Sequence, residues 1–271
     1  MDFSPPPKRA KSPQTALPNW WTCIDRYEIM FSSKADKEEV WMNFGKNLQV
    51  MRKMTNMTQE ELAEKMHVSR QTISKWELGT IWPEMEKLVE LCEMFHCSID
   101  QLVRESMDYS NEAYSDIKIV TVEPFRYISY AVISREPEDD ALSHVEGWAK
   151  QLKTENPYII GWDFPQVSQE QRNVFHMRGY GAALLLEDGQ DIGDIDAEIL
   201  SQNRQKYIML TLKEGTGEEF TIIPNAYKAL LTYMAINGIK EKREPSIISC
   251  YEHEYFDGNG DKFMDIYIAI E

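Results

Sequence analysis

The sequence has no apolar run that approaches the roughly eighteen residues a membrane-spanning helix requires. It also has no charged-then-apolar opening of the kind found in signal peptides. These two absences predict a cytoplasmic protein that does not bind membranes. Cysteine is scarce, at four in 271 residues, and forms no Cys-x-x-Cys pair, which favours reduced thiols used as small apolar residues. We therefore expect no metal site and no cofactor.

Basic residues are few relative to acidic ones, and the formal net charge is −16. This excess is unevenly spread. Residues 1–41 carry six charges of each sign, residues 42–104 carry eight basic and nine acidic residues (8 − 9 = −1), and residues 105–271 carry fifteen and thirty (15 − 30 = −15). The acidity therefore lies in the C-terminal part, and a local basic face within 42–104 can still attract phosphate.

The first 41 residues have no sustained periodicity and open with a run rich in proline, lysine and serine. Such composition predicts a disordered or loosely ordered N-terminal extension. The short basic run Lys8-Arg9-Ala10-Lys11 is also compatible with a nuclear-targeting signal, although runs of this length are common by chance.

Residues 42–104 have a helical pattern in short segments. Thr58 with Glu61 three residues later forms a capping box, and Ser69 caps the next helix, which Gly79 ends. Further boundaries are marked by Pro83, in the first turn of the following helix, and by Ser98, as the cap of a last one. The pattern predicts a compact all-α domain of five short helices.

Two stretches, Thr58-Gln59-Glu60-Glu61-Leu62-Ala63 and Ser69-Arg70-Gln71-Thr72-Ile73-Ser74-Lys75-Trp76-Glu77, closely resemble the phage-repressor, or Xre, family of helix-turn-helix domains. In such a domain the second helix enters the major groove, where Arg can pair with guanine and Gln with adenine. The resemblance implies a structural ion pair between Arg52 and Glu77. The residues we expect to contact DNA are Gln59, Ser69, Arg70, Gln71, Thr72 and Lys75.

The hydrophobic pattern of the sequence changes after a polar linker at 105–115. Strand-like runs and two helical stretches follow in the order β-α-β-β, twice. The second helical stretch runs from Pro224 to Asn237 and is closed by Gly238, and the second unit ends in a hairpin around Asp257-Gly258-Asn259-Gly260. The fold class we expect is therefore multi-domain, with an all-α helix-turn-helix domain followed by an α+β domain over 116–271 that has one antiparallel sheet.

This order of elements, the stretch Ile160-Gly161-Trp162-Asp163-Phe164-Pro165 and the closing hairpin resemble the GyrI-like, or effector-binding, domain family. The resemblance implies a sensor of small molecules, often lipophilic cations, held by aromatic faces and a buried carboxylate. Glu252 and Glu254 share one side of their strand by its period of two, and that side is either the cleft or solvent. The aromatic candidates, each divided between core and cleft, are Trp162, Phe164 and Tyr227.

Together these features predict a transcription regulator. It would bind a palindromic operator in double-stranded DNA as a homodimer and respond to a small-molecule effector. A second hypothesis makes the GyrI-like domain a hydrolase or a sequestering domain, with Glu252 or Glu254 as general base and the helix-turn-helix as a targeting module. A third treats the acidic domain as a protein–protein interaction module.

Overall fold

In the computed structural model, residues 43–105, 115–164, 167–213, 219–244 and 246–271 are described. They divide into two compact units. One unit contains the described residues between 23 and 116 together with those between 217 and 240, and the other contains those between 117 and 216 and between 241 and 270. The expected extension over 1–41 lies outside the described residues.

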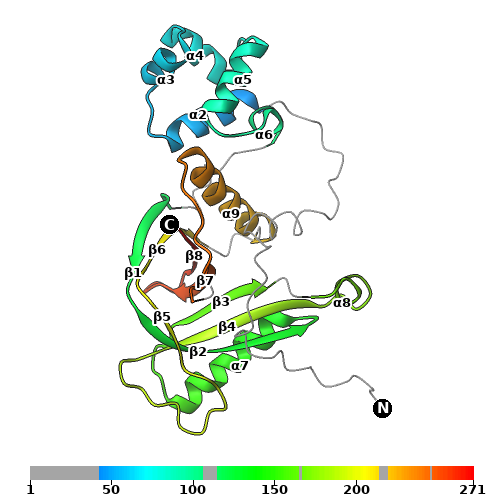
Figure 1. The fold of residues 1–271 in the computed structure, drawn as a ribbon, viewed down its shortest axis with the longest axis vertical. Coiled ribbons are helices and arrows are strands. Elements are labelled where there is room, and N and C mark those ends of the chain that lie inside the picture. Colours follow the sequence, from blue (N-terminus) through cyan, green and yellow to red (C-terminus); the bar gives the residue numbers. More distant parts are fainter. Residues whose placement is uncertain (1–42, 106–114, 165–166, 214–218, 245) are drawn as a thin grey trace. The chain divides into compact units, whose positions relative to one another are not determined.

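The helix-turn-helix unit begins with five short helices around one apolar core (Figure 1). Leu48 of α2, Leu91 of α5 and Phe95, the residue that follows α5, have no exposed surface. The buried Asn47 side chain also joins distant parts of the unit, because its amide donates to the carbonyls of Gln101, Leu102 and Glu105. The helices are α2 (Phe44–Met54), α3 (Gln59–Met66), α4 (Arg70–Glu77), α5 (Met85–Met94) and α6 (Ile99–Val103).

The caps of these helices match the sequence signals. Thr58 and Glu61 make both hydrogen bonds of a capping box at the start of α3, and the Ser69 side chain accepts from the backbone of Thr72 at the start of α4. Gly79 follows α4 in the left-handed conformation, with φ 67°. Proline 83 was expected in the first turn of α5, but it precedes the helix, whose N-cap is Glu84.

A sixth helix, α9 (Glu219–Ile236), belongs to the same compact unit although it comes late in the sequence. The sequence pattern predicted a helix from Pro224 to Asn237, whereas α9 starts five residues earlier and contains Pro224. The helix ends as expected at Gly238, which has φ 64°. The amide of Ile239 then donates to the carbonyl of Met234 and closes the last turn.

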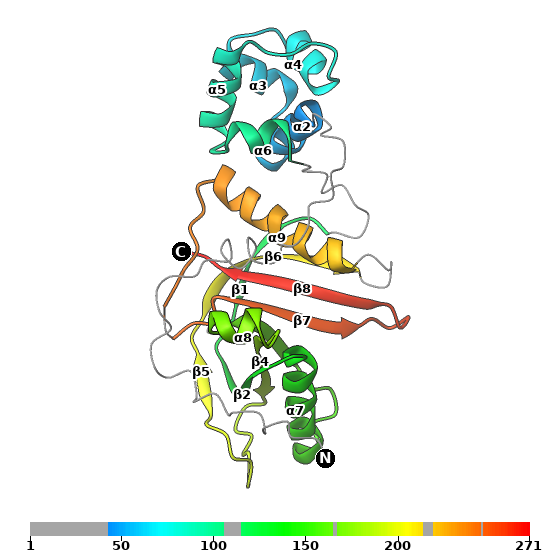
Figure 2. The ribbon, with the colours of Figure 1, turned by 90° about the vertical axis from the view of Figure 1, so that its right-hand side faces the viewer.

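The second unit is built on one eight-stranded antiparallel sheet (Figure 2). The strand order is β1-β6-β8-β7-β3-β4-β2-β5. Two shorter helices complete the unit, and α7 packs on β2, β3 and β4. The elements are β1 (Lys118–Val122), β2 (Phe125–Ser134), α7 (Pro137–Leu152), β3 (Ile159–Phe164), α8 (Gln169–Asn173), β4 (Arg178–Leu186), β5 (Leu200–Gln202), β6 (Gln205–Lys213), β7 (Cys250–Phe256) and β8 (Lys262–Ala269).

Both β-α-β-β orders predicted from the sequence are present along the chain, as β2-α7-β3-β4 and β6-α9-β7-β8, although α9 groups with the helices of the other compact unit. Strands β2, β4 and β3 form one half of the sheet, strands β6, β8 and β7 form the other in the same relative order, and β3 meets β7 in the middle. The pair Gly161–Glu252 joins the halves. Within this arrangement, α8 and the short strand β5 are elements that the periodicity did not predict.

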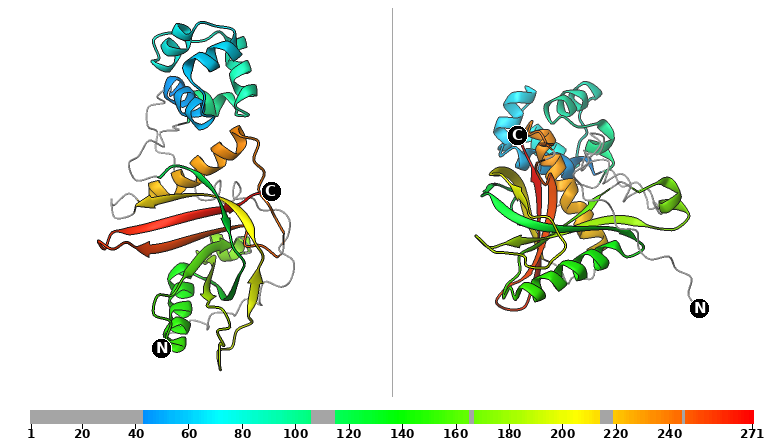
Figure 3. Two further views of the ribbon diagram at one scale, coloured as in Figure 1. Left: turned by 90° about the vertical axis from the view of Figure 1, so that its left-hand side faces the viewer. Right: turned by 60° about the horizontal axis from the view of Figure 1, so that its bottom comes forward.

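The sheet curls because its connections require it (Figure 3). β1 lies at one edge and β2 lies next to the other edge, yet only Glu123 and Pro124 separate the two strands along the chain. A link this short spans roughly 11 Å at most, so the two ends of the sheet must approach each other. The Gln202 side chain of β5 fastens them, since it donates to the Tyr207 hydroxyl at 2.6 Å and accepts from the Ile248 amide at 2.9 Å.

Each face of the sheet has its own apolar cluster. One face packs against α7, where Ile128, Val132 and Leu184 are buried with Val145 of the helix. The inner face of the curl holds a second cluster that includes Tyr207 and Tyr251. No helix in the described part of the chain is long and apolar enough to cross a membrane.

Candidate DNA-reading surface and ligand cavity

Helix α4 separates its packing side chains from its solvent-facing ones. Ile73 and Trp76 are buried in the core, whereas Arg70, Gln71 and Lys75 are exposed. Three extended side chains, two of them cationic, therefore project from a helix only eight residues long. Their donors and acceptors match those needed to contact phosphates and base edges in a major groove.

The remaining residues expected at this surface lie at the N-termini of α3 and α4. Ser69 is exposed and its hydroxyl lies 2.9 Å from that of Thr72, so these two side chains are paired with each other at the start of α4. Gln59, at the start of α3, is half-buried, and its amide donates to Glu77 at 2.9 Å. The structure thus places Gln59 in a contact between helices.

Glu77, the last residue of α4, is the centre of that contact. Arg52 donates to both of its carboxylate oxygens, with Nε 2.6 Å from Oε1 and Nη2 3.1 Å from Oε2. The same guanidinium donates through Nη1 to the carbonyl of Met57 at 2.7 Å. Both side chains are shielded, with 11% and 3% of their surface exposed. A two-point contact between α2 and α4 fixes the angle at which the exposed side chains of α4 are presented.

Gly45 allows α2 and α4 to approach this closely. A Cβ atom at this position would lie 2.5 Å from the carbonyl oxygen of Glu77 and 2.7 Å from that of Trp76. Those distances are well below van der Waals contact, and the neighbouring atoms belong to the backbone and cannot rotate away. The sequence pattern did not single out Gly45, because a glycine inside a helix has no signature that distinguishes close packing from tolerance.

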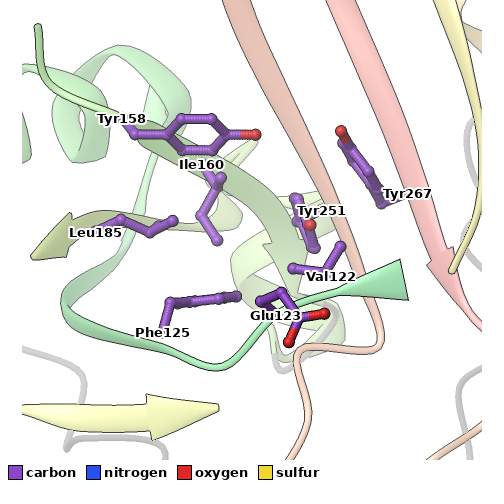
Figure 4. A pocket seen from close by; sticks show the side chains of 8 residues that line it. All are labelled: Val122, Glu123, Phe125, Tyr158, Ile160, Leu185, Tyr251 and Tyr267. Atoms are coloured by element: carbon purple, nitrogen blue, oxygen red, sulfur yellow. The ribbon is translucent and has the colours of Figure 1, made fainter. Parts of the chain in front are cut away.

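The inner face of the curled sheet contains a cavity of about 260 Å³ (Figure 4). Its walls are apolar and aromatic, and they come from both halves of the sheet. The hydroxyls of Tyr158 and Tyr267 point toward each other across it. The lining residues are Val122, Glu123, Phe125, Tyr158, Ile160, Leu185, Tyr251 and Tyr267.

Burial keeps the cavity tyrosines neutral. Desolvation raises the pKa of Tyr251 and of Tyr267 well above the usual phenol range, and it also raises the pKa of Tyr158. Tyr251 stacks on Tyr267 with ring centroids 4.6 Å apart. Neutral, electron-rich rings held face to face offer the negative faces that attract a cation.

A carboxylate lies beside these rings. Asp265 is on β8 two residues before Tyr267, so the two side chains share the inner face. The carboxylate accepts from the Thr211 hydroxyl at 2.6 Å and from the Tyr267 hydroxyl at 3.4 Å. Its negative charge also contributes to the raised pKa of Tyr158. The inner face therefore combines aromatic walls with the carboxylate of Asp265 beside them, while the carboxylate in the cavity wall, Glu123, is paired with Arg204 at 3.0 Å.

The strand register places Glu252 and Glu254 on the opposite face. Glu252 pairs with Gly161 and Ile266, and these lie on the α7 side of the sheet, whereas Tyr251 and His253 share the inner face. Glu254 forms an ion pair with Lys262 at 2.8 Å. The two carboxylates share one side of their strand, as the period of two predicted, but that side is away from the cavity.

The three aromatic residues that were expected to contact a ligand lie outside the cavity wall. Trp162 and Phe164 share the inner face with Ile160, and their rings lie against Gly181 and Gly179 of β4, where a side chain on either glycine would collide with them. Neither ring is among the cavity-lining residues. Tyr227 is on α9, in the other compact unit, and is buried.

Sequence reasoning overlooked the tyrosines that form the cavity. Tyr158, Tyr251 and Tyr267 each alternate with polar or apolar neighbours along a strand, a pattern that marks one face of a sheet without saying what covers it. The useful signal was their number: the inner face also carries Phe125, Tyr127 and Tyr207.

Comparison with known proteins supports the helix-turn-helix interpretation of the first unit. Residues 48–102 match the helix-turn-helix family, and this segment is a helix-turn-helix domain. The HTH-type transcriptional activator BcrR of Enterococcus faecalis is 47% identical over 62 residues, which are 23% of this chain and 30% of BcrR. The uncharacterized HTH-type transcriptional regulator YqaE of Bacillus subtilis (strain 168) is 30% identical over 61 residues, covering 22% of this chain and 53% of YqaE. The similarity thus spans about a third to a half of these relatives.

Among solved structures, one similar chain is EcmrR in a complex with DNA. The alignment covers 83% of this chain and 81% of the EcmrR chain, with 11% sequence identity and a TM-score of 0.43. This score is below the level that establishes a common fold.

Proposed function

We propose that this chain is a transcription regulator that reads DNA through α4 and binds a small cationic, partly apolar molecule in the curled sheet. The observation that carries the DNA-binding part is the exposed row Arg70, Gln71 and Lys75, on a helix whose angle is fixed by the Arg52–Glu77 contact. Arg and Gln are the side chains that make two-point hydrogen bonds to guanine and adenine, respectively.

The proposed regulator binds as a homodimer. One α4 presents eight residues, enough for a few base pairs, and specific recognition by such domains needs two half-sites about ten base pairs apart or a multiple of that distance. The operator in this proposal is accordingly palindromic. The proposed domains are the DNA-binding domain at 42–104, a linker at 105–115 and a ligand-binding domain at 116–271, preceded by the extension at 1–41. The GyrI-like character of the third region is part of the proposal.

The ligand class follows from the chemistry of the cavity. An organic cation that leaves water needs compensation from negative charge and ring faces, and Asp265 with Tyr158, Tyr251 and Tyr267 supplies both. A volume of about 260 Å³ is slightly below the usual range of roughly 300 to 1,000 Å³ for ligand pockets, so a compact ligand fits best. In this proposal Asp265 has the role that the sequence predicted for Glu252 or Glu254.

The DNA-binding part is tested by selection from a pool of duplexes with a randomised 24-base-pair core, in about 0.1 M salt. We expect enrichment of an inverted repeat whose half-sites are centred about ten base pairs, or a multiple, apart. Enrichment of a single, unrepeated motif would contradict the dimer, and recovery of an unenriched pool would contradict sequence-specific reading.

The ligand part is tested by comparing two probes of one shape, phenyltrimethylammonium and neutral tert-butylbenzene. Binding to the native state raises the melting temperature by mass action. We expect stabilisation by the cation at millimolar concentration and a clearly smaller shift with the neutral probe at its solubility limit. Equal effects of the two probes at equal concentration would show that charge has no role in the cavity.

A further inference from the structure

Helix α9 occupies an unusual place in the chain. It lies between β6 and β7, two strands of the sheet, but it groups with the five helices of the DNA-reading unit. The sheet thus contributes a helix from the middle of its own sequence to the other unit. This arrangement gives the two units a direct covalent connection in addition to the linker at 105–115.

The C-terminal end of α9 is attached to α2. Ile236 is 7% exposed and belongs to the apolar core formed by α2 and its neighbours. The side-chain amide of the next residue, Asn237, donates to the carbonyl of Met54 at 3.4 Å and to that of Tyr233 at 2.9 Å. One turn of α9 is therefore held by both an apolar contact and a polar one.

Helix α2 connects the end of α9 to the recognition helix α4. Met54 is the last residue of α2, and Arg52, in the same final turn, holds Glu77 at the end of α4. Close-packed helices move as rigid pieces because their interiors contain few voids. A displacement of the end of α9 against Met54 therefore changes the position of Arg52 and with it the angle of α4.

The chain that follows the same end of α9 continues into the sheet unit. After Gly238 ends the helix, the Lys242 amide donates to the carbonyl of Ala269 at 2.8 Å, and Glu241 bridges to Ile270. Tyr267, which lines the cavity, is two residues before Ala269 on β8. Five residues, 237–241, thus separate the end of α9 from a hydrogen bond to the cavity strand.

From this geometry we propose that α9 transmits occupancy of the cavity to the DNA-reading helix, through the end of β8, residues 238–242, Asn237 and the end of α2. The proposal rests on the proposed function, since it needs a ligand in the cavity and DNA on α4. A ligand that favours one position of the β8 end biases α9, and the recognition helix of that state has a different affinity for DNA. By linkage, DNA must change the ligand affinity by the same factor.

The test uses Ile236→Ala and Asn237→Ala in the full chain, with Ala235→Gln as the matched control. Ala235 is exposed in the same turn of α9. The measured quantity is the ratio of the dissociation constants for the selected duplex with and without saturating phenyltrimethylammonium. We expect a ratio that departs from one by about 5- to 150-fold in the unmutated chain and in the control, and by less than about twofold in both variants. Each separate affinity should stay within about twofold.

A ratio that persists in both variants overturns the proposal. A ratio of one in the unmutated chain also overturns it, while leaving DNA and cation binding as separate functions. If the probe does not bind, amide hydrogen exchange gives a second readout. Binding of the selected duplex should then slow exchange at Ile239 and Lys242 at least about threefold in the unmutated chain and not in Asn237→Ala. No change in the unmutated chain refutes transmission through α9.

Discussion

The guanidinium of Arg52 donates to both carboxylate oxygens of Glu77, at 2.6 and 3.1 Å, and so links the last turn of α2 to the end of α4. The Glu77 side chain is only 3% exposed, and its carboxylate accepts a third hydrogen bond from the Gln59 amide. Removal of the cation would leave a buried charge with one remaining partner. The contact therefore supports both the stability of the unit and the presentation of α4.

Arg52→Met should destabilise the helix-turn-helix unit by about 2 to 4 kcal/mol, because a buried carboxylate loses its counter-charge while Gln59 still donates to it. Urea unfolding followed by circular dichroism measures the change. The matched control is Arg70→Met on exposed α4, which should alter stability by less than about 0.5 kcal/mol. Equal stabilities of the two variants would contradict the role assigned to the ion pair.

Gly45→Ala should destabilise the same unit by about 1 to 3 kcal/mol, since the added methyl would meet the carbonyl of Glu77 at 2.5 Å. Gly147, in the middle of α7, has open space around its Cβ position. Gly147→Ala should therefore stabilise the second unit by about 0.5 to 1 kcal/mol. The melting temperatures of both variants are measured in one set of thermal scans. A stabilising effect of Gly45→Ala would refute the close approach of α2 to the end of α4.

Asp265→Asn should weaken binding of phenyltrimethylammonium by at least about tenfold, because it removes the charge next to the aromatic walls and keeps the shape of the side chain. Glu252→Gln is the matched control, since its carboxylate lies on the α7 side of the sheet. Isothermal titration should give the control an affinity within about twofold of the unmutated chain. A larger loss in Glu252→Gln than in Asp265→Asn would place the cation on the other face.

Acid should weaken cation binding through His253. Its ring stacks on Tyr158 at 3.7 Å and lies opposite Asp265 in the strand register, and burial lowers its pKa below 6.5. Because the folded-state pKa is depressed, the native state favours the neutral ring, and stability is lost as pH falls from about 6.5 through that lower value. The imidazolium formed there faces Asp265 and Tyr255 on the inner face and lies near Glu254, so it offsets the charge that holds the ligand.

The measurement for His253 is the affinity for phenyltrimethylammonium in a pH series that starts at 7.5 and descends through the lowered pKa of the imidazole. We expect a loss of about three- to tenfold on acidification in the unmutated chain, and a change of less than about twofold in His253→Gln. An unchanged acid dependence in His253→Gln would assign the effect to another group.

Local signals in the sequence were sufficient for most of the architecture. Capping pairs such as Thr58 with Glu61, and stop signals such as Gly79 and Gly238, act over three or four residues, and the structure confirms these boundaries. Helix α8 could have been predicted in the same way, because Ser168 and Gln171 form a complete capping box. The start of α9 could not, since Pro224 is a strong boundary signal that the surrounding packing overrides.

The candidate site depended on long-range facts that no local pattern contains. The period of two correctly put Glu252 and Glu254 on one side, but which side is inner is set by pairing with Gly161 and Ile266, far away in sequence. The curl that turns a flat aromatic face into a cavity results from the two-residue link between β1 and β2 combined with their places in the strand order. Strand order is not visible in a single sequence.

The most direct test of DNA reading by α4 compares Gln71→Ala with Gln49→Ala on the selected duplex. Both glutamines are exposed in the same unit, but Gln49 lies on α2. By fluorescence anisotropy we expect Gln71→Ala to lose about 5- to 150-fold in specific affinity, the effect of one base-edge contact, with unchanged binding to unrelated DNA. Gln49→Ala should bind as the unmutated chain does. Equal affinities of the two variants for the selected duplex would contradict the account.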